Sequence, residues 1–171
     1  MGTVILYLAA IVWSNVSVAL WGQAVVLWNA ALFISLDLVA RDRLHDRWAG
    51  PGLWPRMLAL VAVGGVLSAL VNMQAGLVAV VSCLALVGSG LTDAAVYQAG
   101  QRWPWLVRVN VSNVAGGLVD SWVFLGLLSA WVLPSPMPAT VLAGLVLTQW
   151  GLKVAGGLVW SLVWSRVRVA A

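Results

Sequence analysis

The sequence predicts an all-α membrane protein: six transmembrane helices in one compact bundle, with both termini in the cytoplasm. Of its 171 residues, 63% are apolar and only 8% are charged, whereas soluble domains carry about 25% charged residues. Long apolar runs separated by brief polar breaks are typical of transmembrane helices, and the alternating pattern of a membrane β-barrel is absent. The basic residues flank these runs, so the net charge of +4 indicates membrane topology rather than binding to nucleic acid.

Six apolar runs are predicted to cross the bilayer. They cover residues 3–21, 24–40, 57–71, 75–99, 105–133 and 140–164. The fifth run is ended by Pro134, Pro136 and Pro138, because proline lacks a backbone donor and breaks a helix. No basic stretch or cleavage site accompanies the first run, so we expect a retained helix there. The connections are too short for another domain, and we expect one integral membrane domain over residues 1–171.

The arginines are distributed asymmetrically between the connections. They lie after the second run, between the fourth and fifth runs, and after the sixth run: Arg41, Arg43, Arg47, Arg56, Arg102, Arg108, Arg166 and Arg168. With six spans these places are on one side of the membrane, while the connections 22–24, 72–75 and 133–139 hold no Lys or Arg. Because short loops rich in Lys and Arg stay in the cytoplasm, both termini are predicted to be cytoplasmic.

Four ionisable residues fall inside apolar runs: Asp37, Asp93, Asp120 and Lys153. A charge near the bilayer centre costs about 3 kcal/mol on insertion scales, so such residues usually face a bundle interior or a cavity. Asp120 and Lys153 lie almost equally far from Pro136 along the chain, and therefore at similar depth in an antiparallel hairpin. We predict an ion pair between them, which is either a permanent bridge between two helices or a pair that a substrate or proton opens.

A polar stripe runs along the fourth span around Asp93. At about 100° per residue, Ser82, Ser89 and Tyr97 fall within about 40° of this acid. A carboxylate with only neutral neighbours on its own helix suits a ligand that carries N–H donors. Helix packing, or a protonated acid, is the alternative interpretation.

A second stripe runs along the fifth span. Asn110, Asn113, Gly117 and Asp120 share an arc of about 80° there. Each asparagine amide carries donors and an acceptor, so the two asparagines can form hydrogen bonds with a ring carbonyl and a ring nitrogen. Hydrogen bonding between helices is the alternative interpretation.

The second span places Asn29 and Asp37 on one wall, about 80° apart. Asp37 can also pair with Arg41, its i+4 neighbour. His45 lies in a basic connection predicted to be solvated, and Cys83 is isolated in an apolar run, so no metal site is predicted. No nucleophile–base constellation, phosphate-binding loop or dinucleotide fingerprint occurs, and we expect neither an enzyme nor a bound cofactor.

Four stretches carry a pattern found in a known family: NAALFISLDLVARDRLHDRW (29–48), SGLTDAAVY (89–97), VNVSNVAGGLVDSWVF (109–124) and TQWGLKVAGGL (148–158). Together they resemble the vitamin-uptake-transporter family, whose better understood members are the queuosine precursor transporters. The resemblance implies a six-helix inner-membrane importer of 7-deazaguanines such as preQ0 and preQ1. Positions characteristic of the family hold Asn29, Asp37, Asp93, Tyr97, Asn113, Asp120, Gln149 and Lys153. One departure is Gly90, where the family often has an acid.

The residue chemistry and the resemblance together give a predicted substrate site. It comprises Asn29, Asp93, Tyr97, Asn110, Asn113, Asp120, Trp122, Gln149 and Lys153. The N–H edge of a deazaguanine is expected on Asp93 or Asp120, and its carbonyl near Asn113, Gln149 or Lys153. The flat face of the ring is expected against an aromatic side chain. The candidates for that contact are Trp122, Phe124, Tyr97 and Trp160.

The expected partners are a small nucleobase-like solute and the lipid bilayer. Two alternatives stay open. One is the substrate-binding subunit of an energy-coupling vitamin transporter, which has the same size and span count and docks on a coupling module. The other is a non-transporting membrane scaffold protein. The sequence also leaves open whether the chain forms a homo-oligomer, and whether uptake is coupled to protons or is facilitated diffusion.

Overall fold

The computed structural model describes residues 2–21, 25–71 and 77–169. Every regular element within these ranges is a helix. In chain order they are α1 (Gly2–Trp21), α2 (Val26–Asn29), η2 (Ala30–Ile34), α3 (Ser35–Arg47), α4 (Leu53–Val71), α5 (Leu77–Ala99), α6 (Trp105–Leu127), η4 (Leu128–Val132) and α7 (Ala139–Val169). The π-helical turns η2 and η4 continue their neighbours without a break, so the described chain forms six helical rods.

Glycine and proline set the helix boundaries near the connections. Gly50 and Gly52 have φ angles of 111° and 86°, which glycine adopts easily, and they form the turn between α3 and α4. Pro104 has an extended backbone (ψ 143°) directly before α6. Leu133 is also extended (ψ 145°), because the following Pro134 disfavours the helical conformation of the residue before it. Prolines therefore bound the fifth rod at both ends.

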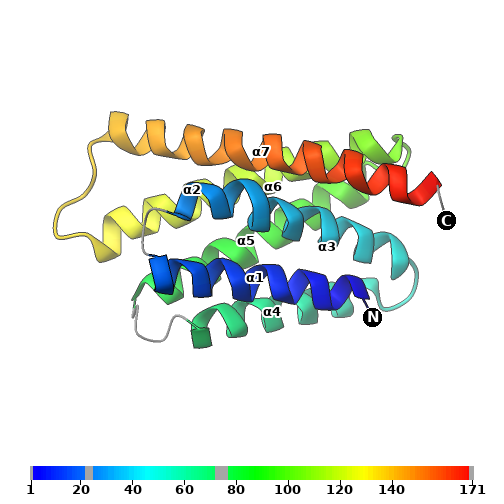
Figure 1. Ribbon diagram of the computed structural model, residues 1–171, viewed down its shortest axis with the longest axis horizontal. Helices are drawn as coiled ribbons and strands as arrows, with labels where there is room; N and C mark the ends of the chain where they lie inside the picture. Colours follow the sequence, from blue (N-terminus) through cyan, green and yellow to red (C-terminus); the bar gives the residue numbers. More distant parts are fainter. Residues whose placement is uncertain (1, 22–24, 72–76, 170–171) are drawn as a thin grey trace.

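The six rods lie roughly along one common axis (Figure 1). α5 packs between α4 and α6, and α6 packs against α7. α1 packs against α3 and α4, and α3 packs against α5, α6 and α7 as well, so α3 is surrounded by other helices. The first and last described residues lie at the same end of the bundle, and the connection 133–138 lies at the opposite end.

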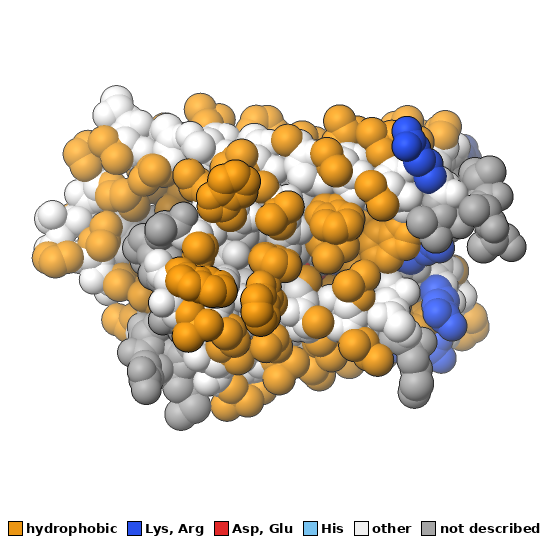
Figure 2. Space-filling view, viewed as in Figure 1, with side chains coloured by type: hydrophobic (Ala, Val, Ile, Leu, Met, Phe, Trp, Pro, Cys, Tyr) orange, Lys and Arg blue, Asp and Glu red, His pale blue; other side chains and the backbone are white. Residues whose placement is uncertain are grey.

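The visible surface is covered largely by apolar side chains, as a lipid-facing surface requires (Figure 2). Lys and Arg side chains appear on this face only at the end where both described chain ends lie. We call this end the basic end. The exposed arginines Arg47, Arg56, Arg102 and Arg166 belong to it.

Four helical stretches are long and apolar enough to cross a bilayer: Leu53–Val71, Val80–Ala99, Trp105–Val132 and Ala139–Arg166. In α1, Gly2–Ser17 forms a shorter apolar helix. The rod made by α2, η2 and α3 carries charged residues in its second half. The described chain is therefore a multi-pass, all-helical membrane protein, whereas six spans with cytoplasmic termini stay a prediction.

The helix does not end at Ala40, where the second span was expected to end. α3 continues to Arg47, because no Gly or Pro interrupts this segment. His45 was expected in a solvated connection, but only 4% of its surface is exposed. Arg41 and Asp42 are buried as well. The charged part of this rod is thus enclosed by other helices instead of forming a loop.

Candidate functional site

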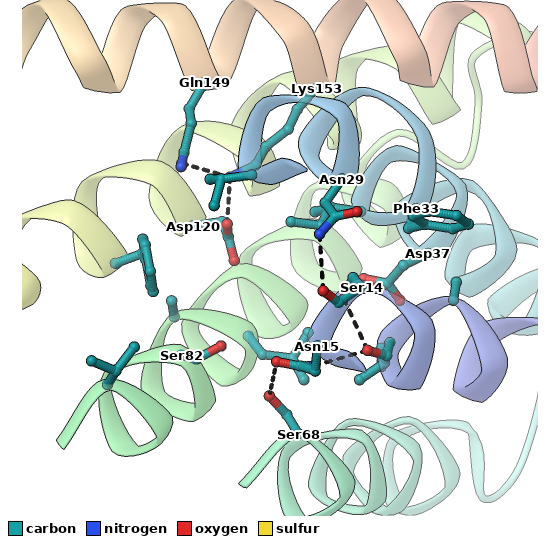
Figure 3. A pocket seen from close by; sticks show the side chains of 18 residues that line it. Ser14, Asn15, Asn29, Phe33, Asp37, Ser68, Ser82, Asp120, Gln149 and Lys153 are labelled. Carbon is teal, nitrogen blue, oxygen red and sulfur yellow. Dashed lines mark hydrogen bonds and ion pairs between the residues drawn. The ribbon is translucent and has the colours of Figure 1, made fainter. Parts of the chain in front are cut away.

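A cavity of about 280 Å³ lies in the half of the bundle away from the basic end. Side chains from all six rods line it. Figure 3 shows its polar lining, which consists of Ser14, Asn15, Asn29, Asp37, Ser68, Ser82, Asp120, Gln149 and Lys153. The aromatic rings of Phe33 and Phe124 also line it. The cavity thus combines charged, amide and aromatic groups in the interior of an apolar bundle.

The wall formed by α6 and α7 contains the ion pair predicted from the hairpin. Lys153 Nζ lies 2.5 Å from Asp120 Oδ2, so that prediction is confirmed. The ammonium also donates to Ser121 Oγ at 2.9 Å and to Gln149 Oε1 at 3.4 Å, which uses all three of its protons. The Lys153 side chain is 1% exposed and that of Asp120 is 14% exposed. The Asp120 carboxylate is therefore the member of the pair that a ligand in the cavity can contact more easily.

The amide of Asn29 ties the second rod to α1. Its Nδ2 donates to the Ser14 carbonyl at 2.9 Å and to Ser17 Oγ at 2.8 Å. Its Oδ1 lies 3.0 Å from the Ser17 hydroxyl. Asn29 lines the cavity, but these bonds occupy its amide, so its contribution to the site is to hold α2 against α1.

Asp37 lies where the cavity ends toward the basic end. Its Oδ2 is 3.7 Å from Arg41 Nη2, which agrees with the i+4 pairing expected from the sequence. Its Oδ1 is buried and has no hydrogen-bond partner among the described residues. A buried acceptor left unsatisfied costs about 1–3 kcal/mol. A ligand N–H that enters the cavity can supply the missing bond.

Beyond Asp37 lies a buried cluster of charges. Arg41 is fully buried, and its Nε lies 3.5 Å from Asp93 Oδ2. Asp42 accepts a hydrogen bond of 2.9 Å from the Ser112 hydroxyl. Asp93 has no cation on its own helix, as the sequence indicated, but its partner comes from α3. We call Asp37, Arg41, Asp42 and Asp93 the Arg41 cluster.

The predicted site residues divide into two groups. Asn29, Asp120, Gln149 and Lys153 line the cavity. The other five lie outside its lining, and they are Asp93, Tyr97, Asn110, Asn113 and Trp122. The structure therefore brings four of the nine together around one hollow.

Asp93 belongs to the Arg41 cluster. Asn113 is buried, and neither the nitrogen nor the oxygen of its side-chain amide has a hydrogen-bond partner among the described residues. Tyr97 accepts a hydrogen bond of 2.8 Å from Arg108. Asn110 donates to Ser161 Oγ at 3.1 Å, which is the interhelical bond named above as its alternative. These four side chains therefore lie outside the cavity lining.

Trp122 is 49% exposed on the outer surface. It follows Asp120 by two residues, so the two side chains point about 160° apart around the helix. The aromatic contacts of the cavity instead come from Phe33 and Phe124. Phe124 was an aromatic candidate, whereas Phe33 was missed.

The contributions of α1 and α4 to the cavity were also missed. Ser14 and Asn15 interrupt the apolar sequence of α1, and this break is the signal that could have identified them. Ser68 lies on α4 and its hydroxyl donates to Asn15 Oδ1 at 3.4 Å. A lone serine in an apolar helix carries no comparable signal.

A family model described as "Putative vitamin uptake transporter" matches residues 2–165. The match extends over all six rods and includes every residue that lines the cavity. A search of curated proteins and a search of solved structures found no match.

Proposed function

Because the chain belongs to the vitamin uptake transporter family, we propose that it imports a queuosine precursor across the inner membrane. The proposed substrate is a 7-deazaguanine such as preQ0 or preQ1, or a purine-like solute of similar shape. Family membership supports a transporter role rather than an enzymatic one. The solute is proposed to bind in the cavity and to pass through the bundle.

In this proposal all six rods cross the membrane and the basic end faces the cytoplasm. The rod over residues 26–47 is about 33 Å long at 1.5 Å per residue, close to the bilayer's hydrocarbon thickness of about 30 Å. Its ionisable residues Asp37, Arg41, Asp42 and His45 are buried by neighbouring helices, and the exposed Arg47 lies at the basic end. The position of both described chain ends at the basic end supports an even number of spans. The arginines at the basic end support this orientation, because short loops rich in Lys and Arg stay in the cytoplasm.

The observation that carries the proposal is the unsatisfied Asp37 Oδ1 at the inner end of the cavity. Asp120 presents a second carboxylate to the same hollow. Two carboxylates that face one hollow favour a ligand rich in N–H groups. A deazaguanine offers such an edge through its ring N–H and its exocyclic amine.

The remaining lining fits the other features of such a ligand. The Gln149 amide can donate to the ring carbonyl, because only its Oε1 is engaged by Lys153. Phe33 and Phe124 provide apolar surface for a flat ring. A volume of about 280 Å³ is at the lower limit of small-molecule sites, which run from about 300 to 1,000 Å³. This size favours one fused ring system over a larger nucleoside conjugate.

Uptake of radiolabelled preQ0 and preQ1 into proteoliposomes tests the proposal directly. The purified full chain is expected to give saturable uptake that protein-free liposomes lack, measured with and without an imposed proton gradient. Asp37→Asn and Asp120→Asn are each expected to reduce uptake at least about tenfold, because a hydrogen bond to a charged group contributes about 1.5–3 kcal/mol. Absence of uptake of both compounds by protein that is monodisperse in detergent would remove this substrate class.

Thr148→Val is the matched control for these variants. Thr148 is exposed on α7, and its hydroxyl donates to the Gly144 carbonyl of its own helix at 2.9 Å. Its substitution removes a polar group from the same region without touching the cavity. Uptake by this variant is expected to match that of the parent.

The alternative of a substrate-binding subunit has one structural observation in its favour. Gly144, Gly151 and Ala155 are exposed along α7, and a Cβ added at either glycine would meet nothing within 4 Å. Small residues on a lipid-facing helix allow close approach of another helix. Co-purification of the chain with an ATPase module from its native membrane would favour this role over autonomous import.

A further inference from the structure

A polar stripe on α3 connects the cavity to the basic end. Asp37 lines the cavity, and His45 lines a second hollow of about 290 Å³ near the basic end. Arg41 lies between them. Because these residues are four apart, they share one helix face with a rise of about 6 Å between neighbours. The stripe therefore spans the wall between the two hollows.

The Arg41 side chain fills this wall but is held only by long ion-pair contacts. It is fully buried, yet its contacts with Asp93 and Asp37 measure 3.5 and 3.7 Å. None of its nitrogens makes a hydrogen bond within the described chain, although a guanidinium carries five N–H donors. A charge held by attraction alone can move without breaking directional bonds.

Gly90 of α5 provides the space that the guanidinium occupies. A Cβ at this position would lie 2.5 Å from Arg41 Nη1 and 2.9 Å from Val61 Cγ2. Any larger residue would have to displace the arginine tip. The missing side chain on α5 and the buried arginine on α3 are therefore two parts of one arrangement.

We propose that Arg41 is the inner gate of the transport route. Held between Asp37 of α3 and Asp93 of α5, its guanidinium closes the passage from the cavity to the hollow at the basic end. The route opens when α3 moves away from α5 and carries Arg41 out of the wall. A solute whose N–H groups bind Asp37 competes with Arg41 for that carboxylate, which links occupancy of the cavity to the gate. This inference rests on the proposed transport function.

The start of α3 is anchored in a way that suits a pivot. The Ser35 hydroxyl donates to the Ala30 carbonyl at 2.8 Å and lies 3.1 Å from the Lys153 carbonyl on α7. Trp160 Nε1 donates to the Leu32 carbonyl at 2.9 Å. A Cβ at Gly156 would lie 1.9 Å from the Ala31 carbonyl oxygen, so η2 and α7 are in direct backbone contact.

The far end of α3 adds polar contacts with other helices to the apolar packing of Val39, Ala40 and Leu44. Arg108 of α6 pairs with Asp46 and also donates to Tyr97 Oη at 2.8 Å. Ser112 binds Asp42. Such bonds can exchange for bonds to water at the basic end, whereas the anchor at η2 cannot be hydrated without separating two backbones. A swing of α3 about η2 therefore opens the bundle at the basic end.

Thiol accessibility tests the gate without knowledge of the substrate. Ser82 lines the cavity, so the parent for labelling is Ser82→Cys combined with Cys83→Ala. A membrane-impermeant thiol reagent is added to inverted vesicles, where the basic end faces the reagent. The thiol introduced at position 82 is expected to react slowly in this parent. Adding Arg41→Gln with Asp93→Asn is expected to raise the labelling rate at least tenfold.

The matched control neutralises the other buried ion pair. Lys153→Gln with Asp120→Asn leaves the wall intact, so labelling from the basic end is expected to stay slow. Gly90→Ala is the second test variant, because it keeps every charge and only displaces the arginine tip; a smaller rise in rate is expected. Folding of each variant is checked by gel filtration in detergent.

An unchanged labelling rate in both the Arg41→Gln/Asp93→Asn variant and Gly90→Ala would overturn the gate. Rapid labelling of the parent from the basic end would overturn it as well. These outcomes are separate from the substrate question. Faster labelling of the Arg41→Gln/Asp93→Asn variant in a protein that does not take up preQ0 would retain the gate and reject the substrate. Uptake of preQ0 by a protein whose labelling rate is the same in all variants would retain the substrate and reject the gate.

Discussion

The bundle contains two buried groups of charges that differ in how they are satisfied. In the first, Lys153 uses all three ammonium protons on Asp120, Ser121 and Gln149. In the second, Arg41 lies 3.5 Å or more from its acids and makes no hydrogen bond within the described chain. Both cations are at most 1% exposed. Burial is therefore the same for both, and hydrogen bonding distinguishes them.

This difference indicates different uses of a buried charge. A buried ion pair recovers its desolvation cost only with good geometry and further hydrogen bonds. The Lys153 pair meets that condition and can act as a fixed wall of the cavity. The Arg41 cluster does not meet that condition. Because its contacts recover little of the desolvation cost, they can be replaced by other contacts with little loss of free energy. Substitutions in the two groups are therefore expected to have unequal effects.

The largest effect is expected from Lys153→Met. The substitution leaves Asp120 without its cation and Gln149 and Ser121 without their donor, and breaking a buried pair from one side costs about 3–5 kcal/mol. Thermal unfolding in detergent is expected at a clearly lower temperature, with preQ0 uptake abolished. Combining the change with Asp120→Asn is expected to recover stability but not uptake. Full uptake by the folded double variant would make the pair a structural bridge only.

Neutralising both partners in each group compares the two directly. Lys153→Gln with Asp120→Asn is expected to destabilise by about 2–3 kcal/mol, because three hydrogen bonds of about 1 kcal/mol each are weakened. Arg41→Gln with Asp93→Asn is expected to change the unfolding free energy by less than about 1 kcal/mol, since poorly bonded buried pairs can be replaced at little cost. Denaturant titrations of both variants measure the difference. Equal losses of unfolding free energy in the two variants would contradict the proposed difference between the two charge groups.

A smaller effect on function alone is expected from Gln149→Ala. The amide donor toward the ligand is lost, and a net hydrogen bond of about 0.5–1.5 kcal/mol corresponds to up to about tenfold weaker apparent affinity. Initial uptake rates over a range of preQ1 concentrations give this value. Thr148→Val, one residue away on the same helix, is expected to leave it unchanged. If both variants behave alike, Gln149 does not contact the solute.

A small effect on stability is also expected from Gly90→Ala. The new methyl group displaces the flexible tip of Arg41 and presses on Val61, at an overpacking cost of about 1 kcal/mol. Gly144→Ala is the control, because its Cβ would meet nothing within 4 Å and alanine favours a helix. Unfolding temperatures of the two variants are expected to move in opposite directions. A stabilised Gly90→Ala would mean that Arg41 does not occupy this space.

The fold was predictable where it depends on local sequence. Apolar runs and prolines located the rods, and the asymmetric arginines identified one end of the bundle. The continuation of α3 past residue 40 was not predictable by that reasoning, because charged residues were taken as a sign of water. Arg41 and Asp42 are enclosed by partners such as Asp93 and Ser112 from helices distant in sequence. That information resides in tertiary packing.

The site was predictable to a similar extent. The Asp120–Lys153 pair followed from the symmetry of a single hairpin, which is local information. The partner of Asp93 and the lining by Phe33 depend on the rotation of the second rod relative to the others. Periodicity assumes uniform α-helix, and η2 departs from it without a signal in composition. Residues on the second rod were therefore the hardest to place.

The wide turn at Ala30–Ile34 sets which face of α3 points toward the cavity. It accommodates one residue more than a regular α-helical turn, so the same sequence wound as regular α-helix would place everything that follows about 100° further around the rod axis. Asp37 would then leave the cavity lining and Arg41 would turn away from Asp93. Neither composition nor hydropathy would differ. A homologue with one residue fewer at this point would form regular α-helix there and keep both its recognition surface and its barrier in place.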